Sequence, residues 1–400
     1  MQENSTSPSL IVSRSELDEL ANHLRSAGRF AFDTEFVSEE TFEPNLCLIQ
    51  IATADRLALI DPLAVRDLAA FWDVVVDPAV EVVMHAAGED LRICKIQTGT
   101  VPSRVFDVQI AAGLLGPGYP LSLGNLVSQR MGITLAGGET RTDWRRRPLT
   151  SAQLRYALDD VRYLLKLADG LVDELEPLGR IGWAEAEFAS FLAEIKDRSG
   201  EERWRRLPGL HQLNRRGLEV ARRLADWRQA DARRANRPLR SVLRDDLLVA
   251  IAKRQPENRR DLEALRDFNR PHLISKANEI LGVIAEAHEA APDDLPTQGE
   301  RRDDGPGVAM VVSLLSATLA RCCGQNRVAV GLVGGAGDLR ELIRWHVEGR
   351  PDDRIPSLAE GWRKDVCGET LIDVLSGRRA LRVVDPEADI PVALDPVADS

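Results

Sequence analysis

Apolar and polar positions divide the chain into regions of different periodicity, and the first 180 residues begin with short apolar runs. Four runs rich in β-branched and aromatic residues predict strands, at Phe30–Val37, Leu46–Thr53, Leu57–Leu63 and Val80–Ala87. Helical spacing then dominates in four segments, at 89–97, 108–115, 121–131 and 151–175. Strands in hairpin-like succession followed by helices predict one α/β domain over residues 1–180, with a mixed sheet flanked by helices.

The periodicity becomes purely helical after residue 203. Apolar residues recur at helical spacing to about residue 290, no run reads as a strand, and prolines interrupt the pattern. We therefore expect an all-α bundle of four or five helices over 203–290. Residues 291–307 are rich in Pro, Gly and Asp and predict a linker. Residues 308–400 mix both patterns and predict a smaller C-terminal domain whose type the pattern does not identify.

Charge is distributed unevenly over these regions. The 400-residue chain has a formal net charge of −11, yet residues 203–276 hold 20 Lys and Arg against 9 Asp and Glu, a local net charge of +11. A basic helical unit in an acidic chain favours sequence-independent binding to nucleic-acid phosphates. The alternative is that these arginines form solvated helix faces or pair with the acidic N-terminal domain.

The cysteines and the apolar runs exclude other classes of protein. The five cysteines include no C-x-x-C pair, which argues against a disulfide framework and a zinc ribbon, and favours a reducing, cytoplasmic location. The N-terminus has no basic segment followed by an apolar run, so we expect no signal peptide. The longest apolar stretch, Val308–Ala320, is expected to be too short to span a bilayer, and no membrane partner is expected.

Two carboxylates lie two residues apart on the first predicted strand. Asp33 and Glu35 alternate with Phe32, Thr34 and Phe36, so both acids project from the same strand face. Burying two like charges is costly unless a cation or a proton neutralises them. The alternative interpretation is a strand edge whose acids face solvent.

Further acids occur at the predicted start of one helix and within a later one. Asp90 follows the fourth strand, where it, or Glu89, can instead act as a helix cap, and nearby His85 more often satisfies a core hydrogen bond than binds metal. Tyr156 and Asp160 are four residues apart and share a helix face. An ordinary amphipathic helix with surface acids is the alternative there.

Four carboxylates that converge from a strand, a helix start and a later helix would hold two hard divalent cations through oxygen ligands. Two such ions polarise a phosphodiester and activate an attacking water, and a tyrosine hydroxyl one turn before the last acid could orient that water. The set comprises Asp33, Glu35, Asp90 and Asp160, with Tyr156 beside them.

These segments resemble the three exonuclease motifs of the DEDD superfamily, in its tyrosine-containing subgroup. FDTEF, HAAGEDL and the Y-x-x-x-D spacing match in order, and the last selects Asp160 over Asp159. TDWRRRPLT, LIDPL (Leu59–Leu63) and F-D-x-Q (Phe106–Gln109) resemble ribonuclease D in particular. The resemblance implies a ribonuclease H-like fold and two divalent cations, Mg²⁺ or Mn²⁺.

The resemblance also implies roles and an activity. Asp33 would contact both metals, Glu35 and Asp160 the metal that activates water, Asp90 the second metal, and Tyr156 would position the water. The implied activity is that of a 3′–5′ exoribonuclease that trims 3′ ends of precursor tRNA and other small structured RNAs, releasing nucleoside 5′-monophosphates. Alternatives are a 3′–5′ exodeoxyribonuclease of the Werner type and a non-catalytic RNA-binding protein.

The arginine-rich loop before the third motif is a candidate for substrate contacts. Of Arg141, Arg145, Arg146 and Arg147, the last is the best candidate for a phosphate contact, while Asp143 and Trp144 are expected to fix the loop.

Residues beyond 203 resemble the helicase-and-RNase-D C-terminal (HRDC) domain. LADWRQADARRANRP followed by VLRDDLL is the most specific stretch, and the resemblance implies nucleic-acid binding. RNA is the expected partner, and nothing in the chain demands an oligomer, so a monomer is expected. VGGAGDL (Val333–Leu339) lacks nucleotide-loop spacing and is interpreted as a strand–turn–helix junction.

Overall fold

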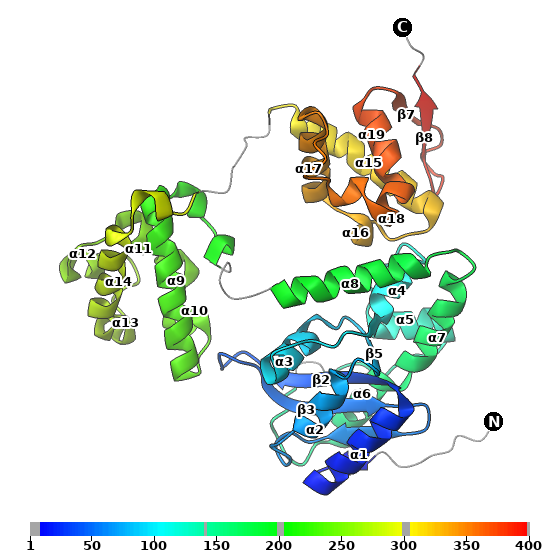
Figure 1. The fold of residues 1–400 in the computed structure, drawn as a ribbon, viewed down its shortest axis with the longest axis horizontal. Helices are drawn as coiled ribbons and strands as arrows, with labels where there is room; N and C mark the ends of the chain where they lie inside the picture. The colour runs from blue at the N-terminus through cyan, green and yellow to red at the C-terminus, as the bar shows by residue number, and fades with distance from the viewer. Residues whose placement is uncertain (1–8, 140–141, 198–203, 298–304, 398–400) are drawn as a thin grey trace.

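The computed structural model describes residues 9–139, 142–197, 204–297 and 305–397. Figure 1 shows three bodies, with the N-terminal α/β domain at the bottom, a central helical domain at the left and a C-terminal domain at the top right.

A six-stranded mixed sheet organises the N-terminal domain. Its strand order is β1-β4-β3-β2-β5-β6, with β3 antiparallel to both neighbours and the other pairs parallel. The central strand β2 lies between β3 and β5. The strands are β1 (Ser9–Ile11), β2 (Arg29–Val37), β3 (Asn45–Ala52), β4 (Leu57–Ile60), β5 (Glu81–Met84) and β6 (Val105–Asp107).

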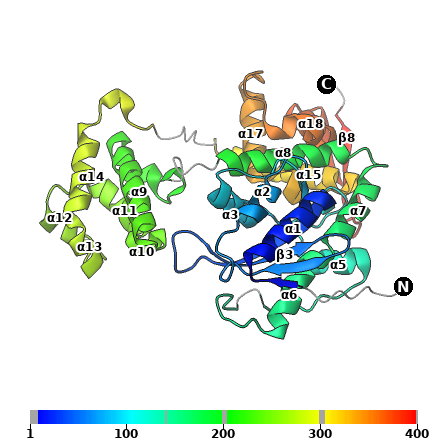
Figure 2. The same cartoon turned by 60° about the horizontal axis from the view of Figure 1, so that its bottom comes forward.

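Helices cover both faces of this sheet. One face packs its aromatic residues Phe30 and Phe32 against α1, α2 and α3, which lie over the strands in Figure 2. The other face packs Ala31, Leu48 and Leu59 against the later helices. The helices are α1 (Arg14–Ala27), α2 (Ala69–Val75), α3 (Gly88–Thr98), α4 (Val108–Gly113), α5 (Leu123–Met131), α6 (Ser151–Arg162), α7 (Leu164–Leu175) and α8 (Ile181–Asp197).

The periodicity located the four longer strands but missed several elements. It overlooked α1 and α8 and the two three-residue strands β1 and β6. The single helix expected over 151–175 is two helices, α6 and α7, that meet at Tyr163. The three-residue strands are too short to show an alternation of apolar and polar positions.

The central domain is all-helical, and its described part contains six helices rather than the expected four or five. Three of them are only four or five residues long, which is too short for a helical repeat to be visible in the sequence. Gly217 of α9 lets the chain approach the carbonyl of Ala252 closely, where a Cβ would lie 3.1 Å from that oxygen. The helices are α9 (Arg215–Ala235), α10 (Leu239–Val242), α11 (Asp245–Arg254), α12 (Arg259–Glu263), α13 (Pro271–Ser275) and α14 (Ala277–Glu289), with short 3₁₀ turns at η2 (Leu210–Gln212) and η3 (Pro292–Asp294).

One loop of the N-terminal domain contacts the central domain. Phe42, between β2 and β3, donates its backbone N–H to Asn236 Oδ1 at 3.2 Å. The Arg233 guanidinium lies over the Phe42 ring, 5.2 Å from its centroid. The loop that follows the two strand acids therefore also touches the end of α9.

The C-terminal domain packs on α8 of the N-terminal domain. Glu187 of α8 accepts hydrogen bonds from Trp362 Nε1 and from the guanidinium of Arg363, and the N–H of Ala329 donates to the Gly113 carbonyl. Both contacts are interdomain. Its elements are α15 (Val308–Asn326), α16 (Val330–Val333), α17 (Ala336–Val347), η4 (Ser357–Ala359), α18 (Gly361–Arg363), the π-helix η5 (Lys364–Gly368), α19 (Glu369–Leu375), β7 (Arg379–Val383) and β8 (Val392–Pro396).

Two expectations for this domain are wrong. Helix α15 does not end at Ala320 but continues to Asn326, so it is 19 residues long. Within the described residues it is the one helix that is long and apolar enough to cross a membrane. Its Leu315, Leu319 and Cys322 are buried in the domain core, which is the typical use of such a helix in a folded domain. The VGGAGDL segment joins two helices, α16 and α17, so no strand precedes its glycines.

Candidate active site

Strand β2 presents Asp33 and Glu35 on the same sheet face. In the register with β3, Asp33 lies opposite Gln50 and Glu35 lies opposite Leu48. Because directly opposed residues of antiparallel strands project to the same side, these four side chains share one face. The acids therefore point toward α6, which packs on this face, and away from the aromatic core under α1.

A bulge in β3 lies directly beside Glu35. The register shifts between Glu35, opposite Leu48, and Phe36, opposite Leu46, so Cys47 is the additional residue. Arg147 Nη2 donates to the Cys47 carbonyl at 2.7 Å, and the same guanidinium forms two hydrogen bonds with Asp61, at 2.6 and 2.7 Å. Arg147 thus ties the bulge to the end of β4.

Arg147 is consequently a structural residue, and the expectation that it contacts substrate phosphate is wrong. Its remaining donors also go to carbonyl groups, those of Trp144 and Arg146. Burial alone would raise the pKa of Asp61, but the hydrogen bonds from Arg147 outweigh it and hold that pKa below its usual range. Local sequence does not reveal a carboxylate partner 86 positions away.

The other residues of this loop divide into paired and exposed side chains. Arg145 pairs with Asp143 and Glu40, and Trp144 is buried, which agrees with the expected structural role of Asp143 and Trp144. The Arg146 side chain is 84% exposed, so it is the loop arginine that substrate could reach most readily. Arg141 lies outside the described residues.

The second motif places Asp90 beside β2. Strand β5 ends at Met84, and the turn that follows leads into α3, whose first turn contains Asp90. The Thr34 hydroxyl donates to the Asp90 carboxylate, while α3 has no side-chain cap, so capping by Asp90 or Glu89 is not observed. His85 Nε2 hydrogen-bonds the Leu121 carbonyl at 2.8 Å, as expected of a core histidine.

Asp107 holds this turn in place from β6. Its carboxylate accepts from the N–H of Ala87 at 2.9 Å and of Ala86 at 3.3 Å, and it also caps α4. Ala86 has a φ of 55°, a conformation that needs such support in a residue other than glycine. Asp107 belongs to the F-D-x-Q motif, but local sequence reveals neither its support of this turn nor the contact of Thr34 with Asp90.

The third motif lies on α6. A capping box of Thr150 and Gln153 begins this helix, and Tyr156 and Asp160 follow on one face. A hydrogen bond from Tyr156 acts on the Asp160 carboxylate, and the Tyr156 ring packs near the buried ring of Trp144, 6.1 Å between centroids. Asp159 instead faces Arg162 at 3.6 Å, which supports the choice of Asp160.

The structure brings the predicted acids together. Ligand oxygens of Asp33, Glu35 and Asp160 all lie within 4.8 Å of one another. Burial, followed by the charges of Asp90, Asp160 and Glu35, raises the pKa of Asp33 well above its usual range. Within the described ranges, no ion pair joins any of the four acids to a lysine or arginine.

The pKa values of the other three acids are raised in the same way. Burial, with the charges of Asp160 and Asp90, raises the pKa of Glu35 to about 8. Burial raises the pKa of Asp90 to about 7 against the hydrogen bond from Thr34, and that of Asp160 to about 7 against the one from Tyr156. Crowded carboxylates that resist ionisation are a donor set suited to hard divalent cations, which relieve the repulsion and accept oxygen ligands.

Part of the positive charge of the central domain is paired within the domain. Arg222 and Arg223 both bind the buried Glu219, and Arg228 binds Asp245. The expected pairing of arginines with the N-terminal domain is limited, in the described residues, to the stacking of Arg233 on Phe42. These ion pairs lie within the central domain, whereas the expected alternative was pairing with the N-terminal domain.

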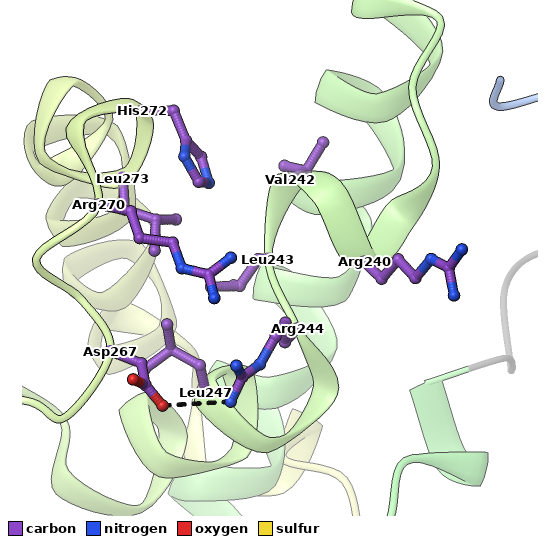
Figure 3. Close-up of a pocket in the computed structure, with 9 residues that line it drawn as sticks. All are labelled: Arg240, Val242, Leu243, Arg244, Leu247, Asp267, Arg270, His272 and Leu273. Carbon is purple, nitrogen blue, oxygen red and sulfur yellow. Dashed lines mark hydrogen bonds and ion pairs between the residues drawn. The ribbon is translucent and has the colours of Figure 1, made fainter. Parts of the chain in front are cut away.

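A group of basic side chains lines a pocket of this domain. Arg240, Arg244, Arg270 and His272 line one pocket beside α10 and α13. Figure 3 shows Arg270 and His272 facing the pocket, Arg244 joined to Asp267, and Arg240 directed away on the other side. Arg240 and Arg270 form no ion pair with any residue in the described segments.

Comparisons with known proteins agree with this geometry. A 3′–5′ exonuclease family model matches residues 9–176, and an HRDC domain model matches 217–284. The chain is 35% identical to ribonuclease D of Granulibacter bethesdensis over 94% of its length and 95% of the relative's, and 31% identical to that of a Shewanella species over 90% and 92%. The structure of Escherichia coli RNase D superimposes with a TM-score of 0.81 at 28% identity, covering 93% of this chain and 99% of that one.

These findings confirm the expected fold, a mixed-sheet exonuclease domain followed by an HRDC domain. The three exonuclease motifs identified in the sequence all lie inside the range that matches the exonuclease family model. The chain belongs to the ribonuclease D family of divalent-metal-dependent 3′–5′ exoribonucleases.

Proposed function

We propose that this enzyme trims the 3′ ends of precursor tRNA and other small structured RNAs and releases nucleoside 5′-monophosphates. The observation that carries the proposal is the cluster of Asp33, Glu35 and Asp160, whose ligand oxygens lie within 4.8 Å of one another, with Asp90 electrostatically linked to it. The solved Escherichia coli relative is described as an exoribonuclease involved in structured RNA processing, which supports this choice of substrate class.

Each acid has a proposed role in holding two divalent cations, Mg²⁺ or Mn²⁺. Asp33, in the centre of the cluster, would hold both, Glu35 and Asp160 the ion next to the attacking water, and Asp90 the second. When bound, such ions polarise the scissile phosphodiester and activate the attacking water. Both ions would bind the ionised carboxylates, because a carboxylate ligand must lose its proton.

Tyr156 is proposed to orient the attacking water. Its hydroxyl lies one helical turn from Asp160 and interacts with that carboxylate, so it is positioned beside the proposed metal ligand rather than in the aliphatic core. The packing of its ring near Trp144 restricts the direction of the hydroxyl. A positioned hydroxyl of this kind contributes typically ~10²-fold or more to the rate.

The HRDC domain is proposed to hold the RNA body while the 3′ end enters the acid cluster. The unpaired Arg240 and Arg270, with the pocket that Arg270 and His272 face, supply positive charge for phosphates. Contacts of this type carry no sequence information, which suits a nuclease that shortens different RNAs. The enzyme is proposed to act as a monomer, since each chain supplies the complete set of acids.

The decisive experiment uses a 3′-extended precursor tRNA labelled at its 5′ end. With Mg²⁺ or Mn²⁺ we expect a ladder that shortens one nucleotide at a time, and none with EDTA or with Asp33→Ala. A matched DNA strand run in parallel tests the exodeoxyribonuclease alternative. Tight binding without shortening of either strand would contradict the proposal and favour a non-catalytic RNA-binding protein.

A further inference from the structure

Gln50 is a fully buried amide that has no hydrogen-bond partner in the described structure. Its exposed fraction is 0%, and both Nε2 and Oε1 lack a partner. Leaving a buried amide unsatisfied is costly, and such groups are rare in folded proteins. An orphaned side chain of this kind calls for a partner that the rest of the protein core does not supply.

The position of Gln50 in the sheet identifies the partner. It lies directly opposite Asp33 on β2 and opposite Leu59 on β4. Directly opposed side chains share one face, with Cβ atoms about 4.5–5.5 Å apart. Leu48, two residues earlier, occupies the same face. Of the two side chains directly opposite Gln50, Leu59 is aliphatic and only Asp33 is polar.

Helix α6 covers this face of the sheet. It packs on β2, β3 and β4 through Ala157 and Leu158, which contribute to the same apolar cluster as Leu48 and Leu59. The amide is therefore held between aliphatic groups and the carboxylate in the centre of the acid cluster. A carboxylate that is ionised is a hydrogen-bond acceptor only, and the Gln Nε2 group is a donor.

We propose that Gln50 is a positioning residue for the metal site, whose Nε2–H group donates a hydrogen bond to the ionised Asp33 carboxylate and fixes it in the orientation that holds divalent cations. This role rests on the proposed function of Asp33. Residues that orient metal ligands in this way typically contribute ~10- to 100-fold in metal affinity.

The test compares Gln50→Met, which keeps the length of the side chain and removes the donor, with Ile51→Val, a control on the opposite face of the same strand. The full-length protein is titrated with Mn²⁺, and free Mn²⁺ is followed by electron paramagnetic resonance. We expect Gln50→Met to weaken Mn²⁺ binding about tenfold or more, and Ile51→Val to leave it within twofold of wild type. Binding by Gln50→Met within twofold of wild type overturns the proposal.

Thermal unfolding in EDTA separates positioning from a structural role. Because Gln50→Met removes an unsatisfied buried amide, its Tm without metal is expected to equal or exceed that of wild type. A Tm well below wild type would show that the amide has a structural partner and would overturn the proposal.

A double-mutant cycle identifies the residue through which Gln50 acts. In an Asp33→Asn background, Gln50→Met is expected to cause no further loss of Mn²⁺ affinity, and a full additional tenfold loss would exclude the route through Asp33. If Asp33→Asn itself binds Mn²⁺ and cleaves RNA like wild type, the proposed function fails. If Asp33→Asn loses both while Gln50→Met loses neither, only the present inference fails.

Discussion

Charged side chains are arranged in opposite ways in the acid cluster and in the HRDC domain. In the exonuclease domain, four carboxylates crowd together, and the described residues place no lysine or arginine in an ion pair with them. In the HRDC domain, by contrast, several arginines are neutralised locally, as in the pairing of Arg222 and Arg223 with Glu219. The difference indicates that like charges are concentrated where a ligand must neutralise them, and that pairing is used where the charge serves the fold.

Arg147 is a paired arginine that lies near the unpaired acids. It is close to the acid cluster, yet its guanidinium is bound to Asp61 and to the Cys47 carbonyl. The pair supports the bulge opposite Glu35, so it serves the geometry of the cluster without neutralising it. The stability of the site and its chemistry can therefore be perturbed separately.

The largest effect is expected from Arg147→Ala. The substitution leaves Asp61, which is 4% exposed, without its partner, and removing one member of a buried pair costs about 3–5 kcal/mol. We expect a fall of that size in the free energy of unfolding by urea. The matched control is Arg146→Ala, whose side chain is 84% exposed and which is expected to change stability by less than ~0.5 kcal/mol. Equal stability of the two variants would contradict the proposed clamp.

The sequence carried enough information to locate the acids but too little to predict their supports. The spacing of Asp33 and Glu35 on a strand and of Tyr156 and Asp160 on a helix follows from local periodicity, and the structure brings the acids together. Gln50 had a visible signal, because it interrupts the otherwise apolar run LCLIQIA. Its position opposite Asp33 depends on the register between strands, which local periodicity does not determine.

The fold shows the same division between local and long-range information. Helix α1 was missed although Ser13 and Glu16 form a capping box that could have been recognised. Strand β1 pairs with β4, whose residues lie about 50 positions later, and no local pattern reveals that pairing. The arginine-rich loop was interpreted by composition alone, and composition cannot distinguish an arginine committed to Asp61 from one that is free.

The next effect concerns the tyrosine beside the acids. Tyr156→Phe removes the hydroxyl that acts on Asp160 and is expected to lower kcat about 100-fold, which corresponds to about 2.7 kcal/mol, with little change in stability. Initial rates on a single-stranded RNA at saturating Mg²⁺ provide the measurement. Tyr163→Phe, at the junction of α6 and α7, is the control and should retain wild-type activity. A kcat for Tyr156→Phe within threefold of wild type would remove Tyr156 from the proposed mechanism.

The crowded acids also predict how pH and metal act together on stability. Their pKa values are raised in the folded state, to about 7 or 8 for Glu35, Asp90 and Asp160. Raised pKa values mean that the folded state binds protons more tightly than the unfolded state. Their contribution to stability is therefore greatest below about pH 4 and is lost as pH rises from about 4 to 8.

Divalent cations bind the ionised form, so their stabilising effect should grow over the same range. At about 100 times its Kd, one ion adds about 2.7 kcal/mol, and less at pH 5.5, where the protonated acids bind it weakly. We expect the difference in Tm between Mg²⁺ and EDTA to increase from pH 5.5 to pH 8. Glu35→Gln should reduce that increase, and a difference independent of pH would contradict this account of the cluster.

The smallest effect is expected in the HRDC domain, where Arg240 and Arg270 line or flank a pocket and form no ion pair with the described residues. If Arg240 and Arg270 each contact one phosphate, replacing both with alanine lowers the slope of log affinity against log salt by about two and weakens binding severalfold at physiological salt. Binding of precursor tRNA is measured by fluorescence anisotropy at several salt concentrations, in EDTA to prevent cleavage. The control Arg259→Ala removes an arginine that already pairs with Glu263 and should leave the slope nearly unchanged. A slope that falls equally in both cases would show that paired and unpaired arginines contribute alike, and that local pairing in this domain does not decide which charges meet RNA.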